Sequence, residues 1–196
     1  MSTPTTVPHR EKLLREGLRQ LYAHGFHGTT IDRILEGSGV PKGSFYHHFG
    51  SKETFARQVL TRYMQFQFDQ LTEWSGRADL PVPALLAGYF RAMADRFVAS
   101  GHRRACLTGK LATEMAAEHD AFREQLAGDL AGWRERIAEL LRLGRERGEV
   151  RGEAPVELLA DAVLALIQGA FVVALAARDE SALASVGTAI ELLVAG

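Results

Sequence analysis

The sequence predicts an all-α protein with a small N-terminal domain and a larger helical domain behind it. Apolar residues recur at helical spacing along nearly the whole chain, and almost no segment alternates as a strand would. Hydrophobic residues make up 46% of the 196 and charged residues 24%, which excludes a disordered or fibrous chain. This length suits one large domain, or a small domain joined to a medium one.

The first nine residues predict a disordered tail. Residues 1–9 carry two prolines and four Ser or Thr but no apolar run, so they do not fit a secretion signal, and we expect a cytoplasmic protein. No stretch reaches the roughly eighteen uninterrupted apolar residues of a membrane helix, so no membrane partner is expected. The single cysteine, Cys106, excludes an internal disulfide.

The helices follow from apolar stripes and their stop signals. Leu14, Leu18 and Leu21 form one stripe that ends at Gly25. Two short helices, 30–36 and 42–48, flank a glycine-containing turn at 37–40, and a longer helix after Ser51 ends at a break over 75–83. Further helices are expected at 84–100, 105–118, 120–147, 156–178 and 181–194, which gives about nine in all.

The charge is divided unevenly along the chain. Residues 1–62 hold nine Lys or Arg against five Asp or Glu, whereas residues 63–196 hold fourteen against nineteen. The basic end is where an acidic polymer would bind, although a difference of this size also arises by chance.

Residues 30–49 have the pattern of a helix-turn-helix motif. Ile31, Ile34 and Leu35 give the first short helix one apolar edge, and Phe45 and Phe49 anchor the second from its inner side. We therefore assign residues 10–54 to a DNA-binding domain and residues 55–196 to a second helical domain, for which the family resemblance described below implies ligand binding and dimerisation. The alternative is a helical hairpin inside an ordinary bundle.

The outer side of the second short helix carries small and hydrogen-bonding residues. Glycine and serine let a backbone approach base edges, and cationic or polar groups at a helix N-terminus bind bases and phosphates. Lys52, in the first turn of the following helix, is placed to bind the flanking phosphate backbone. The outer residues are Lys42, Gly43, Ser44, Tyr46, His47 and His48.

The string GVPKGSFYHHFGSKE resembles the signature of the TetR/AcrR family of transcriptional regulators. That resemblance covers about the first 65 residues, and it implies a homodimeric DNA-binding protein with an all-α ligand-binding domain. Pro41 departs from the Ser or Thr of many members. The DNA contacts that the resemblance implies are Thr30, Lys42, Gly43, Ser44, Tyr46, His47 and Lys52.

The stretch HRRACLTGKLATE resembles a subgroup of that family that regulates electrophile detoxification, including N-ethylmaleimide reductase, and acrylate utilisation. The resemblance implies a reactive cysteine at Cys106. A lysine that accompanies it in a later helix is replaced here by Leu175. Arg103, Arg104 and a helix N-terminus also favour the thiolate that attacks electrophiles, while a lone cysteine is more often a buried small apolar residue.

Aromatic and soft side chains on the middle helices are candidates for an effector pocket. The same residues at helical spacing fit an ordinary core, and only a minority would line a cavity. Besides Cys106, the candidates are Phe90, Met93, Phe97, Met115, Phe122, Trp133, Gln168 and Phe171.

The last two helices are apolar nearly all round, which predicts a homodimer built through them. Two-fold symmetry then predicts a palindromic operator, because one recognition helix contacts too few base pairs to be specific. The alternative is that these helices are internal core. The interface candidates are Leu159, Val163, Leu166, Ala170, Val173, Leu183, Val186, Ile190 and Leu193.

Two function classes remain after these observations. The first is a repressor that a small molecule, an electrophile or a redox signal releases from DNA. The second is a small all-α enzyme with Cys106 as nucleophile, which lacks a phosphate loop and an evident base. His24 and His27 flank a glycine, and His47 and His48 point to different faces, so we expect no metal site and no cofactor.

Overall fold

The computed structural model describes residues 7–196 and confirms the all-α fold class. Within these residues extended pairing is limited to one isolated bridge between Val150 and Ala195. Residues 1–6 of the expected tail lie outside the described part, and His9, its last residue, already opens the first helix.

The helices follow the sequence pattern closely, with one difference at the C-terminal end. The helix expected at 181–194 is interrupted at Ser185, so that ten helical segments are found in the described chain. The segments are α1 (His9–His24), α2 (Ile31–Ser38), α3 (Lys42–Phe49), α4 (Lys52–Ser75), α5 (Val82–Ala99), α6 (Leu107–Met115), α7 (Asp120–Glu146), α8 (Val156–Ala177), α9 (Ser181–Ala184) and α10 (Val186–Val194).

The helix boundaries in the N-terminal region have identifiable caps. Thr30 accepts a hydrogen bond from the Arg33 N–H at 3.3 Å and starts α2, and Ser51 accepts one from the Thr54 N–H at 3.0 Å and starts α4. Gly39 ends α2 in the left-handed conformation that the turn to α3 requires, with φ 64°. These local signals set the orientation of α3.

A shared aromatic core joins α1, α3 and α4. Phe45 and Phe49 of α3 lie 5.1 and 4.8 Å from the ring of Phe55 on α4, centroid to centroid. A Cβ on Gly17 of α1 would stand 2.3 Å from the Phe55 ring, so glycine is what lets α1 approach α4. The outward face of α3 is therefore held by a rigid inner face.

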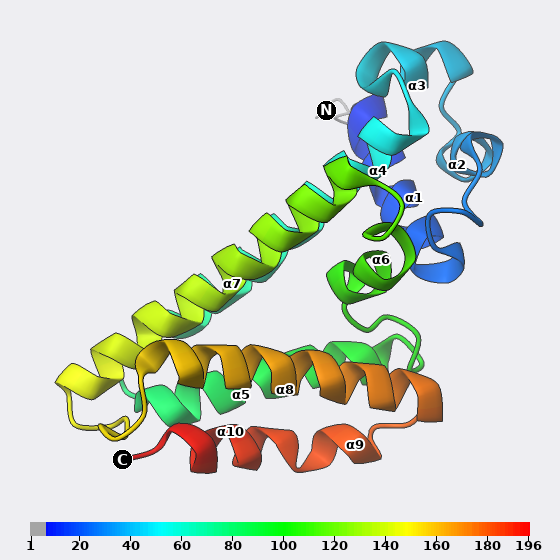
Figure 1. Cartoon of the computed structure of the whole chain (residues 1–196). Helices are drawn as coiled ribbons and strands as arrows, with labels where there is room; N and C mark the ends of the chain where they lie inside the picture. Colours follow the sequence, from blue (N-terminus) through cyan, green and yellow to red (C-terminus); the bar gives the residue numbers. More distant parts are fainter. Residues whose placement is uncertain (1–6) are drawn as a thin grey trace, which may run out of the picture.

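The remaining helices form the larger body. The long helices α4 and α7 lie side by side along its length, and α5, α8 and the α9–α10 segment form layers at the end away from α2 and α3 (Figure 1). Trp133 of α7 is fully buried among them and packs edge-on against Tyr89 of α5. The buried residues of the body and those of α1–α3 belong to one continuous hydrophobic cluster.

The C-terminal helix pair presents a different face from the expected one. Helix α8 is long and apolar enough to cross a membrane by length and composition alone, and it is partly buried in the body. Leu159, Val163, Ala170, Leu183, Val186 and Ile190 are buried within the chain, Leu166 and Leu193 are half-buried, and only Val173 is exposed. Most of the residues expected at a dimer interface thus have no free surface, because α5, α7 and α10 already cover that stripe.

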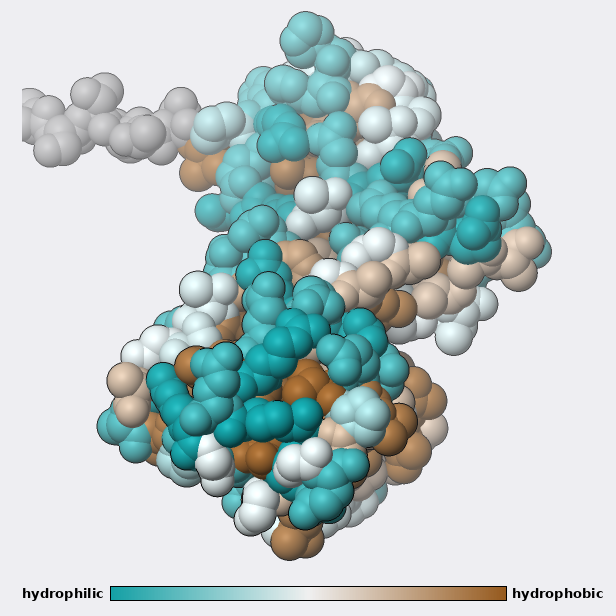
Figure 2. Space-filling view, turned by 60° about the vertical axis from the view of Figure 1, so that its left-hand side comes forward, coloured by the Kyte–Doolittle hydropathy of each residue, from teal (hydrophilic) through white to brown (hydrophobic). Residues whose placement is uncertain are grey.

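The surface reflects this arrangement. Hydrophilic side chains dominate the upper part of the molecule, where α2 and α3 lie, and apolar patches gather on the lower body (Figure 2). Large exposed apolar residues of the C-terminal helices are Leu158, Val172, Val173, Leu175 and Leu192.

Asp129 of α7 supplies a pH-dependent contribution to stability. Its Oδ2 is buried without a hydrogen-bond partner, and burial raises the pKa of Asp129 from 3.8 to about 6. The folded state therefore binds the proton more tightly, and stability falls as the pH rises from about 4 to about 6.

Asp129→Asn should raise the free energy of unfolding at pH 7 by about 1 kcal/mol, after a discount for solvent screening of a half-buried group. Urea unfolding at pH 4, 5, 6 and 7 measures this, with exposed Asp79→Asn as the control. The gain should disappear near pH 4. If Asp129→Asn changed the free energy of unfolding equally at every pH, a buried Asp129 carboxylate would not be the cause.

Candidate nucleic-acid interface and regulatory pocket

Helix α3 divides into an inner face that folds the domain and an outer face that folding does not use. Phe45 and Phe49 are buried, whereas Lys42, Gly43 and His47 are exposed and Tyr46 is 45% exposed. A Cβ on Gly43 would meet nothing within 4 Å, so packing does not require glycine there. The outer face is free to meet a ligand surface.

Three of the sequence-predicted contact residues also have partners within the chain. The Ser44 hydroxyl lies 2.9 Å from Nδ1 of His9, and Thr30 is the N-cap of α2. The Lys52 ammonium lies over the Phe26 ring, 4.4 Å from its centroid, and burial lowers the pKa of Lys52. Lys52 thus packs at the junction between α1 and α4 instead of extending freely from α4.

One carboxylate on α6 joins the N-terminal helices to the body. Glu114 accepts hydrogen bonds from the backbone N–H groups of Phe26, at 2.9 Å, and His27, at 2.8 Å. Gly25 has φ 69°, and a Cβ there would stand 2.3 Å from the Glu114 carboxylate. Lys110, one turn earlier, donates to the Tyr22 carbonyl at 2.7 Å. Helix α6 is therefore attached to the end of α1 and to the loop that leads into α2.

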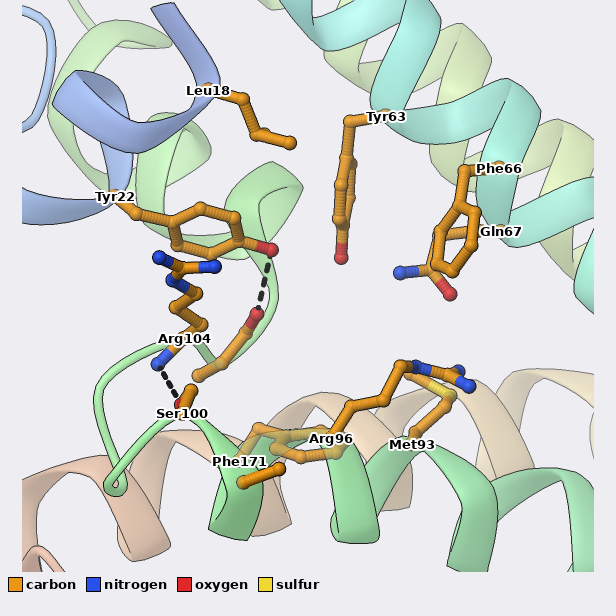
Figure 3. Close-up of a pocket in the computed structure, with 12 residues that line it drawn as sticks. Leu18, Tyr22, Tyr63, Phe66, Gln67, Met93, Arg96, Ser100, Arg104 and Phe171 are labelled. Carbon is orange, nitrogen blue, oxygen red and sulfur yellow. Dashed lines mark hydrogen bonds between the residues drawn. The ribbon is translucent and has the colours of Figure 1, made fainter. Parts of the chain in front are cut away.

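A pocket of about 330 Å³ lies directly behind this attachment. Tyr22 reaches into it from α1, Tyr63 and Gln67 from α4, and Arg96 from α5 (Figure 3). The complete lining is Leu18, Tyr22, Tyr63, Phe66, Gln67, Met93, Arg96, Ala99, Ser100, Arg104, Ala105 and Phe171. Burial raises the pKa values of the Tyr22 and Tyr63 hydroxyls, so both remain neutral.

Only a minority of the predicted effector residues line this pocket. Met93 and Phe171 do, whereas Phe90, Phe97, Met115, Phe122 and Trp133 are buried in the core. Gln168 of α8 lies against α6, where a Cβ on Gly109 would stand 2.9 Å from its Oε1. Core residues and pocket residues recur at the same helical spacing, so sequence periodicity cannot tell them apart.

Cys106 lies between the pocket and α6. It is 7% exposed, and its Sγ accepts from the Gly109 N–H at 3.4 Å as the N-cap of α6, and from the Tyr63 hydroxyl at 3.7 Å. It also lines a surface hollow with Lys110, Leu175 and Arg178. Leu175, which stands where the resemblance implies a lysine, thus lies near the cysteine, and three cations, Arg103, Lys110 and Arg178, line the same hollow.

A possible metal-ligand group lies at the same junction. His27, Glu118 and His119 offer ligand atoms that all lie within 4.8 Å of one another. In the sequence His27 stands with His24 on either side of a glycine, which predicts no metal site. Its neighbours in the structure come from the corner between α6 and α7 instead.

Several important residues escaped the sequence analysis. Tyr22, Gln67 and Arg96 come together only because α1, α4 and α5 cross, and nothing in their local sequence marks them. Glu114 looks like any charge on an amphipathic helix. The one local signal of the close contact with Glu114 is Gly25, which stands between His24 and Phe26.

Family models match the chain in two segments. Residues 13–59 match the bacterial regulatory proteins of the tetR family, and residues 82–190 match the tetracyclin repressor-like C-terminal domain. The first segment contains the helix-turn-helix motif and the second contains α5 to α9 and the start of α10, which agrees with the resemblance inferred from the sequence.

Individual relatives agree with this assignment. The transcriptional regulator AcuR of Cereibacter sphaeroides is 35% identical over 78% of this chain and 69% of its own. The repressor NemR of Escherichia coli is 30% identical over 74% of this chain and 73% of its own. Its reduced crystal structure superposes with a TM-score of 0.88 over 95% and 97% of the two chains, at 27% identity.

A regulatory protein TetR from Rhodobacter sphaeroides has a TM-score of 0.89 at 31% identity, over 95% of this chain and 98% of that one. AcuR and NemR match the subgroup that the Cys106 segment predicted. The chain belongs to the TetR family and is a DNA-binding transcriptional regulator.

Proposed function

We propose that this protein is a homodimeric repressor that binds a palindromic operator and leaves it when a signal reaches the body behind α1. The outer face of α3 carries the proposal, because its exposed polar groups and its glycine serve no purpose in folding. Such proteins act in the cytoplasm, on chromosomal DNA. The regulators found among the relatives support this class over the Cys106 enzyme.

In the proposed complex, α3 enters the major groove. Gly43 lets its first turn approach the base edges, where Lys42 and Tyr46 supply donors. Ser44 and His47 extend the same face, and Thr30 at the start of α2 is placed to bind phosphate. Lys52 contributes through its position beneath this face, where it fixes Phe26.

The dimer is proposed to form through the exposed faces of α8 and α10. Leu158, Val172 and Val173 of α8 are more than half exposed, and Leu192 of α10 is 71% exposed. Apolar side chains gathered on neighbouring helices gain free energy when a second copy covers them. Two-fold pairing here would place the two α3 helices at matched distances from the symmetry axis.

The signal is proposed to travel through α6. A ligand in the pocket contacts Tyr22 at the end of α1 and the segment 99–105 before α6. Displacing either one strains the bond from Lys110 to Tyr22 of α1 and the bonds from the loop before α2 to Glu114. That would change the separation of the recognition helices and lower operator affinity, as a shift between two dimer geometries.

Cys106 supports an electrophile as a second kind of signal. Alkylation adds bulk to an almost buried sulfur and removes its contacts with the Gly109 N–H and the Tyr63 hydroxyl. Because those contacts begin α6, the modification would act on the same helix as a bound ligand.

Gly43→Ala should raise the operator dissociation constant by about tenfold or more, because a new methyl group would separate the backbone from the base edges. The Tm should not fall, since alanine favours a helix over glycine by about 1 kcal/mol. Fluorescence anisotropy on the DNA upstream of the gene measures binding. Gly128→Ala is the matched control, a helical glycine also without neighbours within 4 Å. Unchanged DNA binding by Gly43→Ala would remove α3 from the interface.

N-ethylmaleimide should release the wild-type protein from the operator and leave Cys106→Ser bound. The physical reason is the added volume at a sulfur that caps α6. Anisotropy before and after treatment, with mass spectrometry to count the adducts, tests this. If both proteins release alike, or if the labelled wild type stays bound, Cys106 is structural and the signal is non-covalent.

Glu114→Ala should weaken operator binding by about tenfold, because two charge-assisted hydrogen bonds that orient the loop before α2 are lost. Circular dichroism should show unchanged helix content. Glu146→Ala, an exposed carboxylate near the end of α7, is the control. If Glu114→Ala binds the operator as tightly as wild type and is released by N-ethylmaleimide to the same extent, α6 does not transmit the signal.

A further inference from the structure

The pocket behind α1 has the electrostatic character of an anion-binding site. Arg96 and Arg104 are among its lining residues, and no Asp or Glu is. Neither guanidinium forms an ion pair with a carboxylate in the described part of the chain. The pocket therefore carries positive charge that the protein itself does not neutralise.

Two buried polar groups of the lining lack hydrogen-bond partners. Gln67 is 5% exposed, and its Oε1 is unpartnered. Arg96 donates from Nη1 to Gln70 at 3.0 Å, but its Nη2 is buried and makes no bond. Figure 3 shows Gln67 reaching down from α4 toward Arg96 and Met93, which rise from α5. An unpaired buried donor is costly, so the Arg96 Nη2 at a pocket wall favours a ligand that supplies an acceptor.

The rest of the lining is suited to an apolar body. Leu18, Phe66, Met93 and Phe171 supply aliphatic, aromatic and thioether surface. Tyr63 donates only to the Cys106 sulfur, at 3.7 Å, and sulfur is a weak acceptor, so this hydroxyl is available to a better one. The wall thus offers a cation, further polar groups and an apolar surface within about 330 Å³.

We propose that this pocket binds a small organic acid, with the carboxylate at Arg96 and Gln67 and the apolar part against Phe66, Met93 and Phe171. Arg96 can bind a carboxylate through charge-assisted hydrogen bonds from its unpartnered Nη2, and the amide nitrogen Nε2 of Gln67, not its Oε1, can donate to it. The pocket volume restricts the acid to a small molecule. Its role as the effector rests on the proposed function.

The position of Tyr22 links the acid to DNA binding. The Tyr22 ring lines the pocket, its hydroxyl donates to the Ala105 carbonyl at 3.2 Å, and its own carbonyl accepts from Lys110. Arg104 lies beside Tyr22 at the same wall. The backbone N–H of Arg104 donates to the Ser100 hydroxyl at 2.9 Å (Figure 3). An acid that draws these side chains inward moves the end of α1 relative to α6.

Isothermal titration of the protein without DNA tests the chemistry. The probes are propanoate, benzoate, 3-phenylpropanoate and octanoate, each paired with its neutral primary amide. At least one acid should bind, and its amide should bind about tenfold more weakly or worse, since the charge-assisted bond is lost. Arg96→Gln should remove that preference, Arg96→Lys should restore part of it, and Gln67→Leu should weaken the acid alone.

Arg147→Gln, an exposed arginine at the end of α7, is the control and should behave as wild type. Melting curves of each variant establish that it is folded. Equal binding of acid and amide, an unchanged acid affinity in Arg96→Gln, or no binding by any acid at its solubility limit would overturn the proposal.

Operator anisotropy with the acid that binds tests its role separately. Release of DNA by wild type but not by Arg96→Gln supports an effector role. An acid that binds with the predicted Arg96 dependence and leaves the operator complex intact confirms the pocket chemistry and contradicts the effector role alone. Failure of the protein to bind DNA at all contradicts the proposed function and leaves the titration result valid.

Discussion

One carboxylate joins the loop after α1 to the body, beside the bonds that Tyr22 makes with Lys110 and Ala105. Glu114 of α6 binds two consecutive backbone N–H groups, those of Phe26 and His27, in the loop that leaves α1. Those groups follow the end of a helix and have no partner in it, so the carboxylate satisfies donors that would otherwise need water. Gly25 is required beside it for both its positive φ and its missing Cβ. This contact fixes the loop that leads into α2, while α3 is oriented by its own packing on Phe55.

The pocket and the attachment share the same elements. Tyr22 lines the pocket with its ring and is held to α6 through its carbonyl, and Cys106 begins α6 while touching Tyr63. A non-covalent ligand would act on α6 through Tyr22 and Lys110, and a thiol adduct would act on it through its N-cap, Cys106. Both signals would therefore reach the same short helix. Helix α6 has only nine residues, which makes a rigid-body displacement easier than bending.

The sequence predicted the features that depend on residues close together in the chain, such as helix ends, caps and the two sides of α3. Gly25 ends α1, Ser51 caps α4, and Phe45 and Phe49 fix the inner side of α3, so the outer side followed directly. The pocket depends on crossings between distant helices. Gln67 and Arg96 could not be placed together from periodicity, and buried aromatics such as Trp133 and Phe97 look the same as pocket residues in sequence.

The C-terminal helices show where the spacing of apolar residues no longer predicts which face of a helix is buried. Helix α8 is apolar over most of its circumference, with Glu157, Asp161 and Gln168 on one side, so period alone does not decide which apolar stripe faces the core. Within the chain, the face with Leu159 and Val163 packs against other helices, and residues of the opposite face, among them Val172, remain exposed. Small residues at Ala165 and Gly169 lie on this exposed face and add little bulk. A second copy could approach closely there, and burial of the neighbouring valines and leucines would then supply the association energy. The same apolar composition thus serves the core of one chain on one face and is proposed to serve the dimer on the other.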